Sequence, residues 1–240
     1  MKTWMARVWR LGLALSALCL IWLLAVGSFA QDSPFTRVYS FDQDAAGKTP
    51  GGFTATLTKG GGETAVRWEL VEAGDAISGR QVVGQLSSDT TRNRFPLLVL
   101  DDSSLKDIEL SVKFKPISGT VDQAAGIVWR LKDNDNYLVV RANALENNVV
   151  VYKTVAGQRS SIGVRGNPQS YGVRAEVPAN KWSTLRVRMI GDVGEVFLND
   201  TKLFEIENNE FPAAGKVGLW TKADSVTHFD DFKVTSLDRP

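Results

Sequence analysis

The sequence is poor in the residues on which many catalytic sites depend. It has one cysteine, Cys19, and one histidine, His228. Because Cys19 lies within the first 30 residues, the rest of the chain has no thiol for a disulfide, a zinc-thiolate site or a cysteine nucleophile. A single imidazole cannot build a multi-histidine metal site, and a serine triad would have to use His228. Most classes of enzyme are therefore disfavoured.

The chain also lacks an excess of charge of either sign. It has 28 Lys+Arg against 27 Asp+Glu, a formal net charge of +1. Three of the basic residues lie in residues 1–30, which hold no acidic residue, so the remainder is close to neutral. Domains that bind nucleic acid are typically strongly basic. We therefore expect no nucleic-acid partner.

The N-terminal segment has the pattern of an export signal. Basic residues precede residues 11–27, which contain no charge and no proline, and the small residues Ser28 and Ala30 stand before Gln31. We predict a signal peptide over residues 1–30 that is cut before Gln31. The alternative is an uncleaved anchor, since the apolar run approaches the length of a membrane span. Both alternatives predict a secreted, periplasmic or cell-envelope protein. If the segment is not cleaved, it is the only part of the protein that we expect to contact a membrane.

Residues 31–240 read as one domain, because no linker, charge block or repeat divides them. Apolar and polar residues alternate with the period of two that is typical of half-buried strands. The segments with this pattern are residues 65–71, 81–86, 96–101, 107–114, 124–132, 137–142, 148–155, 184–189, 193–198, 202–206, 216–221 and 227–235. No segment has a helical stripe. The sequence therefore predicts an all-β fold, either an antiparallel sandwich or a closed barrel.

Two segments interrupt the strands and are predicted to be long loops. Residues 43–64 are rich in glycine and threonine, and residues 164–181 combine glycines and prolines with Tyr171. Long loops within a compact domain often carry function, and Tyr171 could offer an aromatic ring to a ligand. The alternative is that the second loop only covers a sheet edge or is poorly ordered.

Six segments carry a resemblance to a known group of folds. They are residues 125–130, 136–141, 149–153, 182–187, 215–224 and 229–234. Their order and spacing resemble the concanavalin A-like, laminin-G-like jelly rolls of exported bacterial proteins, which include the 3-keto-disaccharide hydrolase domains. The resemblance spans residues 36–237 and implies two curved antiparallel sheets. It also implies that sugars bind the concave face or its rim loops.

Sugar sites combine aromatic rings with planar polar groups that bond adjacent hydroxyls. Strand alternation places Arg130 with Val128 on one face and Trp129 in the core with Leu131. The predicted ligand-binding residues are Arg130, Tyr137, Arg141, Asn143, Tyr152, Lys153, Tyr171, Trp220 and Lys222. The alternative is a solvated face on which arginine stems cover apolar surface.

Two pairs of acidic residues meet the spacing that places both side chains on one face of a strand, Asp107 with Glu109 and Glu205 with Glu207. The related glucanases carry three alternating acids, and neither pair extends to a third. The hydrolase relatives typically carry a glutamate on the strand that residues 137–141 form here, and this chain has none there. We therefore assign no catalytic residue and favour a binding protein over an enzyme.

Acidic residues near both ends of the domain suggest a metal site. If Phe232 faces the core, alternation places Asp230 there too, and a buried carboxylate needs a partner. The resemblance implies a structural Ca²⁺ between the last strand and the first, with oxygen ligands. Its candidate ligands are Asp42, Asp44, Asp230 and Asp231. The alternative is hydrogen bonding to backbone N–H groups or an arginine, and no other cofactor is expected.

Three hypotheses for function follow. The first is an exported module that binds carbohydrate, or another extracellular ligand, on its concave face. The second is a glycoside hydrolase resembling the 3-keto-disaccharide hydrolases, which needs two carboxylates about 5 to 9.5 Å apart in one groove. The third is a structural or protein-contact domain of the cell envelope.

Overall fold

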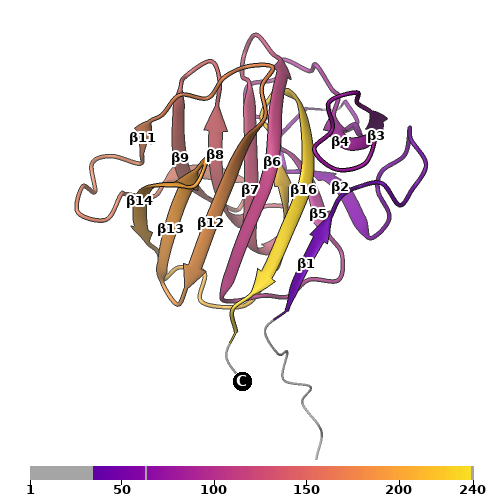
Figure 1. Ribbon diagram of the computed structural model, residues 1–240. Helices are drawn as coiled ribbons and strands as arrows, with labels where there is room; N and C mark the ends of the chain where they lie inside the picture. Colours follow the sequence, from indigo (N-terminus) through magenta and orange to yellow (C-terminus); the bar gives the residue numbers. More distant parts are fainter. Residues whose placement is uncertain (1–34, 63, 239–240) are drawn as a thin grey trace, which may run out of the picture. The chain divides into compact units, whose positions relative to one another are not determined.

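The computed structural model describes residues 35–62 and 64–238, which form sixteen strands and no helix. Every strand pair is antiparallel, and the strands make two eight-stranded sheets (Figure 1). In spatial order, the first sheet contains β14 (Thr201–Glu207), β13 (Val193–Leu198), β12 (Ser183–Ile190), β6 (Ile108–Ser118), β16 (Val226–Ser236), β4 (Gln81–Gln85) and β3 (Trp68–Glu72), with β1 (Thr36–Tyr39) paired to β16. The second sheet contains β10 (Gln158–Ser161), β9 (Asn148–Val155), β8 (Asn136–Asn143), β7 (Ala124–Asp133), β15 (Lys216–Trp220), β5 (Pro96–Leu100) and β2 (Phe53–Leu57), with β11 (Gly172–Arg174) paired to β9.

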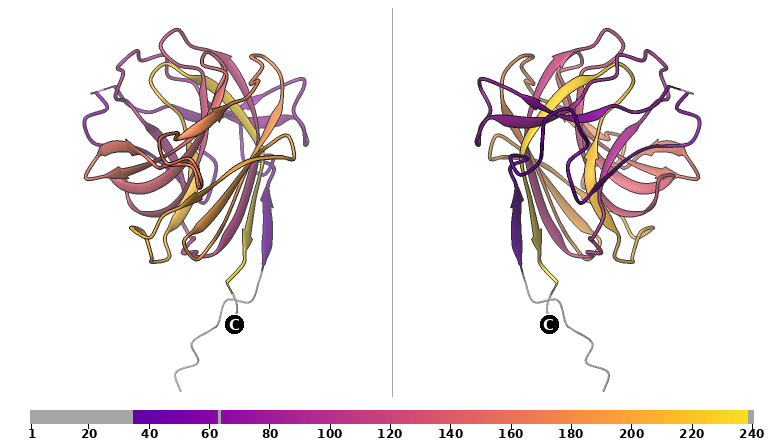
Figure 2. Two further views of the ribbon diagram at one scale, coloured as in Figure 1. Left: turned by 90° about the vertical axis from the view of Figure 1, so that its left-hand side faces the viewer. Right: turned by 90° about the vertical axis from the view of Figure 1, so that its right-hand side faces the viewer.

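The main core lies between the two sheets, which Figure 2 shows as two layers seen from the side. Trp68, Phe114, Phe229 and Phe232 contribute to this core from the first sheet, and Trp129 contributes from the second. Each of these side chains is at most 1% exposed. Burying a large apolar side chain stabilises a fold by roughly 1.5 to 3 kcal/mol, so these rings account for much of the packing energy. The core role predicted for Trp129 is confirmed.

All twelve segments with strand alternation form strands, which confirms the all-β sandwich. The two predicted loops are partly wrong, because β2 lies within residues 43–64 and β11 within residues 164–181. Both are short strands at sheet edges, where pairing with one neighbour is enough to order the backbone. The signal peptide predicted over residues 1–30 lies outside the described residues. Within the described ranges, no helix is long and apolar enough to cross a membrane.

A β-bulge in β7 changes which side chains share a face. Arg130 has a positive φ of 47°, and the register between β7 and β8 shifts between Trp129 and Asp133. The extra residue in a bulge reverses the alternation that follows it. Leu131 therefore packs with Val128 on the outer face of the second sheet, where alternation had predicted Arg130.

Candidate functional site

The outer face of the second sheet carries its own hydrophobic cluster, separate from the core between the sheets. We call this surface the second-sheet face. Its cluster contains Phe95, Leu97, Val99, Ala124, Val128, Leu131, Tyr137, Val139 and Trp220, with Tyr152 packed against it. Tyr137 is fully buried, and its hydroxyl lies 2.8 Å from that of Thr58 and accepts a hydrogen bond from Trp220 at 3.4 Å. The segment after β2 therefore covers part of this face.

A row of paired residues crosses the second-sheet face from Arg141 on β8 through Gly126 on β7 to Trp220 on β15. Gly126 leaves room for the indole, because a Cβ there would lie 3.0 Å from the Trp220 ring and 2.9 Å from the Val140 carbonyl oxygen. Trp220 stacks on Phe95 with ring centroids 5.5 Å apart. This row therefore separates the apolar half of the face, which contains Trp220 and Phe95, from a charged half, which contains Arg141.

The charged half of the face centres on Arg141, which is only 1% exposed. Its Nη2 donates to Glu146 Oε2 at 2.6 Å and to Asn148 Oδ1 at 2.9 Å, and its Nη1 lies 4.0 Å from Asp122 Oδ2. Lys222 Nζ donates to the same Asp122 oxygen at 2.5 Å. Burial raises the pKa of Glu146, but the hydrogen bond and charge of Arg141 outweigh it and hold that pKa below its ordinary value. Glu146 is therefore ionised at neutral pH.

Two buried side chains hold this cluster in place. Asn143 Nδ2 donates to Asp122 Oδ1 at 2.5 Å, and Asn143 Oδ1 accepts from the backbone N–H of Glu146 at 3.2 Å. Asp224 accepts hydrogen bonds from three successive N–H groups, those of Thr120, Val121 and Asp122, at 2.6 to 3.1 Å. Burial raises the pKa of Asp224, but these backbone donors outweigh it and lower the pKa overall. Asp122 and Glu146 are thus fixed through the backbone that carries them.

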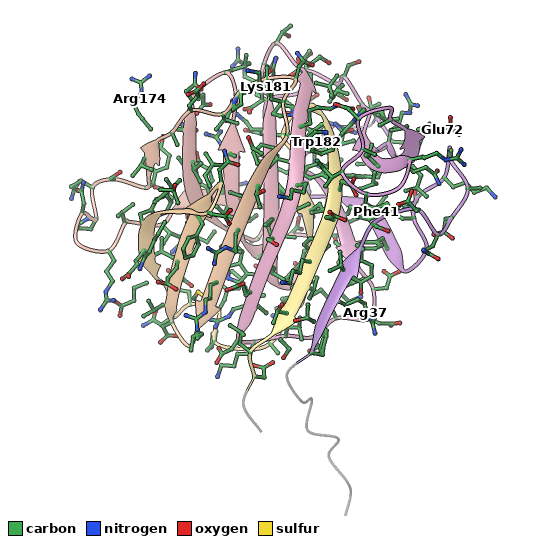
Figure 3. All side chains as sticks on the ribbon, viewed as in Figure 1. Arg37, Phe41, Glu72, Arg174, Lys181 and Trp182 are labelled. Atoms are coloured by element: carbon green, nitrogen blue, oxygen red, sulfur yellow. The ribbon has the colours of Figure 1, made fainter. Side chains whose placement is uncertain are left out.

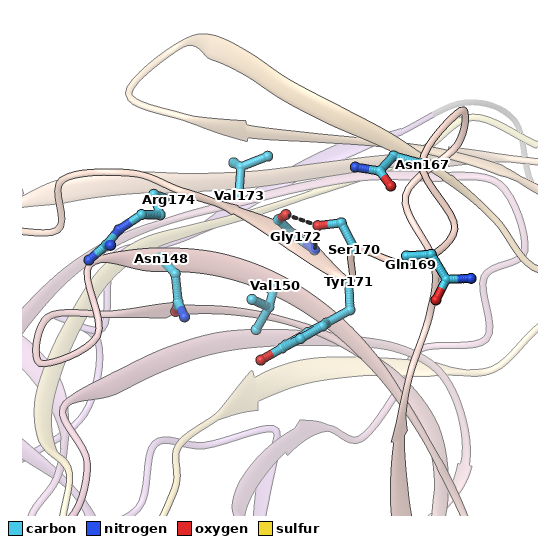
Figure 4. A pocket seen from close by; sticks show the side chains of 9 residues that line it. All are labelled: Asn148, Val150, Asn167, Gln169, Ser170, Tyr171, Gly172, Val173 and Arg174. Carbon is cyan, nitrogen blue, oxygen red and sulfur yellow. Dashed lines mark hydrogen bonds between the residues drawn. The ribbon is translucent and has the colours of Figure 1, made fainter.

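An aromatic edge borders the charged half. Tyr152 on β9 and Tyr171 have ring centroids 5.6 Å apart, and Tyr171 is 41% exposed. Beside them is an open hollow of about 440 Å³, shown in Figure 4 with Asn148 and Arg174 at one end and Asn167 and Gln169 at the other. Arg174 projects from the β11 edge (Figure 3). The hollow forms because β11 pairs with β9 and carries the preceding loop across the edge of the sheet.

The structure brings most of the predicted ligand-binding residues onto one face. These are Tyr137, Arg141, Asn143, Tyr152, Tyr171, Trp220 and Lys222. Four of them are at most 1% exposed and therefore pack below the surface of the face: Tyr137, Arg141, Asn143 and Trp220. Tyr152, Tyr171 and Lys222 keep exposed surface that a ligand can reach.

Two predicted residues lie elsewhere. Arg130 is displaced by the bulge and donates to the carbonyl oxygens of Phe211, at 2.7 Å, and Gly191. Lys153 alternates with Tyr152 and therefore points away from the second-sheet face, where it pairs with Glu210. Both side chains serve other contacts in the structure.

Sequence reasoning missed four residues of this face: Asp122, Glu146, Asn148 and Arg159. Asp122 lies just before β7, and Glu146 lies in the turn between β8 and β9. Both are brought to Arg141 by strand pairing that the sequence pattern does not specify. Residues 146–148, an acidic residue followed by two asparagines, have the composition of a turn, and this was the available signal for two of them.

The acidic pairs singled out for their spacing lie away from this face. Glu109 on β6 is 3.5 Å from Arg186, and Glu205 on β14 is 2.6 Å from Lys202. The hydrogen bond from Lys202 lowers the pKa of Glu205. These carboxylates belong to a network of ion pairs on the outer face of the first sheet.

The carboxylates predicted to hold Ca²⁺ accept hydrogen bonds from the protein instead. A bulge in β16 places both Phe229 and Phe232 in the core, so Asp230 lies opposite Lys113 on the outer side of the sheet. The expectation that Asp230 shares the core face with Phe232 is therefore wrong. Asp230 Oδ2 accepts from the N–H groups of Ile77 and Ser78 at 2.8 and 3.0 Å. Burial nevertheless raises the pKa of Asp230.

The other candidate ligands are similarly occupied. Asp42 Oδ1 accepts from the N–H groups of Arg80 and Gln81, and Asp44 Oδ2 accepts from Gly51. No group of three or more acidic, histidine or cysteine side chains in residues 35–62 and 64–238 is arranged to hold a metal ion. The residues as placed do not fit a Ca²⁺ shared between the first and last strands.

We expect removal of divalent cations to leave the stability of the domain unchanged, because backbone donors already satisfy these carboxylates. The measurement is the melting temperature of the purified protein in EDTA and in excess CaCl₂. A rise of several degrees that depends on Ca²⁺ would show that ligands gather around an ion and would contradict this expectation.

Comparison with known proteins gives one family match. Residues 40–235 match the model of a family described as the 3-keto-alpha-glucoside-1,2-lyase-like domain. No curated protein matches the chain in sequence.

One solved structure shares the fold at low sequence identity, and two others are similar to a lesser degree. The carbohydrate-binding module CBM66 from Bacillus subtilis is 18% identical with a TM-score of 0.55, and the match covers 76% of this chain and 94% of the module. The exoplasmic/lumenal domain of VIP36, in its Ca²⁺/Man-bound form, is 14% identical with a TM-score of 0.49, over 83% of this chain and 88% of that one. Domain 4 of the arabinanase AbnA from Geobacillus stearothermophilus, in complex with arabinotriose, is 14% identical with a TM-score of 0.45, over 76% and 82%. The resemblance to a concanavalin A-like jelly roll is confirmed.

Proposed function

The chain belongs to the 3-keto-alpha-glucoside-1,2-lyase-like domain family, and from this premise we propose that it is an exported protein that binds carbohydrate on the second-sheet face. The ligand lies along the edge formed by Glu146, Asn148, Tyr152 and Tyr171. The resemblance implies that sugars bind the concave face or its rim loops, and we propose that the second-sheet face is that face. The export signal predicted over residues 1–30 is part of the same proposal.

The observation that carries the proposal is the meeting of two aromatic rings with fixed polar groups at this edge. The rings of Tyr152 and Tyr171, 5.6 Å apart, offer an apolar surface of the kind on which a pyranose packs. Glu146 and Asn148 are held by Arg141 within 2.9 Å, so their orientation is set before a ligand arrives. A preorganised site loses less conformational entropy on binding.

A second function, cleavage of a glycosidic bond, has one specific observation in its favour. Asp122 Oδ2 and Glu146 Oε1 lie 4.0 and 3.3 Å from the same Arg141 nitrogen, so the two oxygens are no farther apart than the sum of those distances. This upper limit is compatible with the separation of about 5 to 9.5 Å at which two carboxyl groups flank a glycosidic bond. The low pKa of Glu146 makes it a base and not a proton donor at neutral pH. Asp122 is buried and neutralised by Lys222, which favours binding over catalysis.

We expect Tyr171→Ala and Glu146→Gln each to weaken saccharide binding by about tenfold, which corresponds to about 1.4 kcal/mol. The first removes the exposed ring, and the second removes the charge that Arg141 orients. The measurement is a glycan array followed by titration calorimetry on the purified protein, with product analysis on the same saccharides.

Two variants outside the face serve as matched controls. Ile190→Ala removes an apolar side chain that is 41% exposed, as Tyr171 is, and Glu205→Gln removes an ion-paired carboxylate on the first sheet. Both should bind as the unaltered protein does. Release of a cleaved product would favour the second function, whereas no binding to any saccharide would leave the structural role.

A further inference from the structure

Arg159 is the one arginine of the second-sheet face that packs between two aromatic rings. It lies on β10 opposite Thr154 of β9. Its guanidinium carbon is 4.2 Å from the centroid of the Tyr152 ring and 4.9 Å from that of Phe95. This arrangement is favourable, because cations pack well on ring faces within about 6 Å. Arg159 therefore lies beside the aromatic edge of the proposed site.

The charge of Arg159 has no partner among the residues that the structure describes. No described carboxylate lies within 4.0 Å of it, no described group accepts a hydrogen bond from it, and its Nη1 is buried without a partner. The neighbouring cations differ, since Arg141 pairs with Glu146 and Lys222 pairs with Asp122. A buried donor without an acceptor destabilises the fold, and the cost is greater when the donor is charged. Within residues 35–62 and 64–238, the Arg159 guanidinium is thus left without a polar partner.

Electrostatics around Arg159 favour an incoming negative charge. Burial lowers the pKa of Arg159, and the positive charge of Arg141 adds to this effect, while Tyr152 and the charge of Asp122 oppose it without reversing it. Arg141 lies on the same aromatic ring, with its guanidinium carbon 5.8 Å from the Tyr152 centroid. The face holds the cations Arg141, Arg159 and Lys222 and the anions Asp122, Asp224 and Glu146. Among the described residues, Arg159 is the cation of this set that has no carboxylate within 4.0 Å.

A ligand can reach Arg159 from solvent. An open hollow of about 210 Å³ lies against it, lined by Lys59, Gly60, Asn93, Phe95, Gly157, Gln158 and Arg159. Lys59 adds a second cation to this hollow. Tyr152 contacts both Arg159, which lines this hollow, and Tyr171 of the proposed saccharide-binding edge.

We propose that the saccharide bound on the second-sheet face is anionic, and that Arg159 binds its carboxylate or sulfate group. This inference rests on the proposed function and names the class of sugar. A guanidinium presents two parallel N–H donors that match the oxygens of a carboxylate or sulfate, and charge-assisted hydrogen bonds of this kind are about twice as strong as neutral ones. The anion supplies the opposite charge that Arg159 lacks among the described residues.

The test compares saccharides that differ only in charge. One pair is oligogalacturonide and its methyl ester, and the other is a sulfated galactan oligosaccharide and its desulfated form. Titration calorimetry on the full-length protein at low salt should show that at least one anionic member binds about tenfold more tightly than its neutral counterpart. The preference should shrink as salt is raised, because counterions screen exposed charges.

Two variants test whether Arg159 is responsible for the preference for anionic saccharides. Arg159→Gln should remove the preference for the anionic member and leave binding of the neutral member in place. Arg67→Gln, which removes an arginine paired with Glu69 outside the second-sheet face, should leave the preference unchanged.

The outcomes separate this inference from the proposed function. Equal affinity for both members of each pair, or a preference that survives in Arg159→Gln, overturns the inference while the proposed function stands. No binding of any charged or neutral saccharide overturns both.

Discussion

Replacing Asp122 with alanine is expected to lower the free energy of unfolding by about 3 kcal/mol, the lower end of the range for breaking a buried ion pair. Asp122 is 1% exposed and accepts hydrogen bonds from Lys222 and Asn143, both at 2.5 Å. The alanine variant leaves these donors without their acceptor and removes a negative charge beside Arg141. Lys222 keeps some exposure and can turn toward water, which limits the loss.

The measurement is urea denaturation of the purified protein, followed by circular dichroism. Asp122→Asn should cost less, because its side-chain oxygen can still accept one of the two hydrogen bonds. The double variant Asp122→Ala, Lys222→Met should recover part of the loss, because it removes the ammonium left unpaired. An Asp122→Ala protein as stable as the unaltered one would show that the cluster contributes nothing to the fold.

Alternation predicted the strands well because one face of each packs in a core. In β6, for example, Ile108, Leu110, Val112 and Phe114 are all fully buried, while the residues between them are partly exposed. β10 and β11 lack this signal. Residues 158–161 are entirely polar, and β11 has only three residues. These strands form because β9 offers free backbone groups at its edge, which is a property of the folded sheet.

The candidate site was predicted only in part because alternation fails at bulges and says nothing of partners. The bulge at Arg130 moved that residue off the face, and the bulge after Asp230 moved a carboxylate out of the core. Neither bulge has a glycine to mark it. Arg141 was placed on the correct side of β8, but its partner Glu146 depended on how the following turn folds back.

Arg159 illustrates the same limit. Nothing near it in sequence indicates that two rings from β9 and from the segment before β5 enclose its side chain. The pattern of polar residues around it is typical of an exposed loop. The enclosure arises when β10 folds back on β9, so it depends on tertiary structure alone.

Replacing Trp220 with alanine should have the largest effect on stability, a loss of about 3 to 5 kcal/mol, because it opens a cavity where a large buried ring was removed. Trp220 is fully buried in the cluster on the second-sheet face. Its ring lies nearly parallel to Phe95, at an interplanar angle of 18°. Because Phe95 is one of the two rings that enclose Arg159, the variant should also loosen that guanidinium.

Comparison with Trp220→Phe distinguishes this supporting role from direct contact with a ligand. Phenylalanine keeps an aromatic ring against Phe95, so this variant should lose less stability than Trp220→Ala and retain most of its saccharide binding. Urea denaturation gives the first quantity and titration calorimetry the second. If Trp220→Phe were as stable as the unaltered protein but failed to bind saccharide, the indole would have to meet the ligand itself. Because Trp220 is completely buried, we expect the opposite result. Its substitutions should lower stability, and saccharide binding should weaken only as a consequence of that loss.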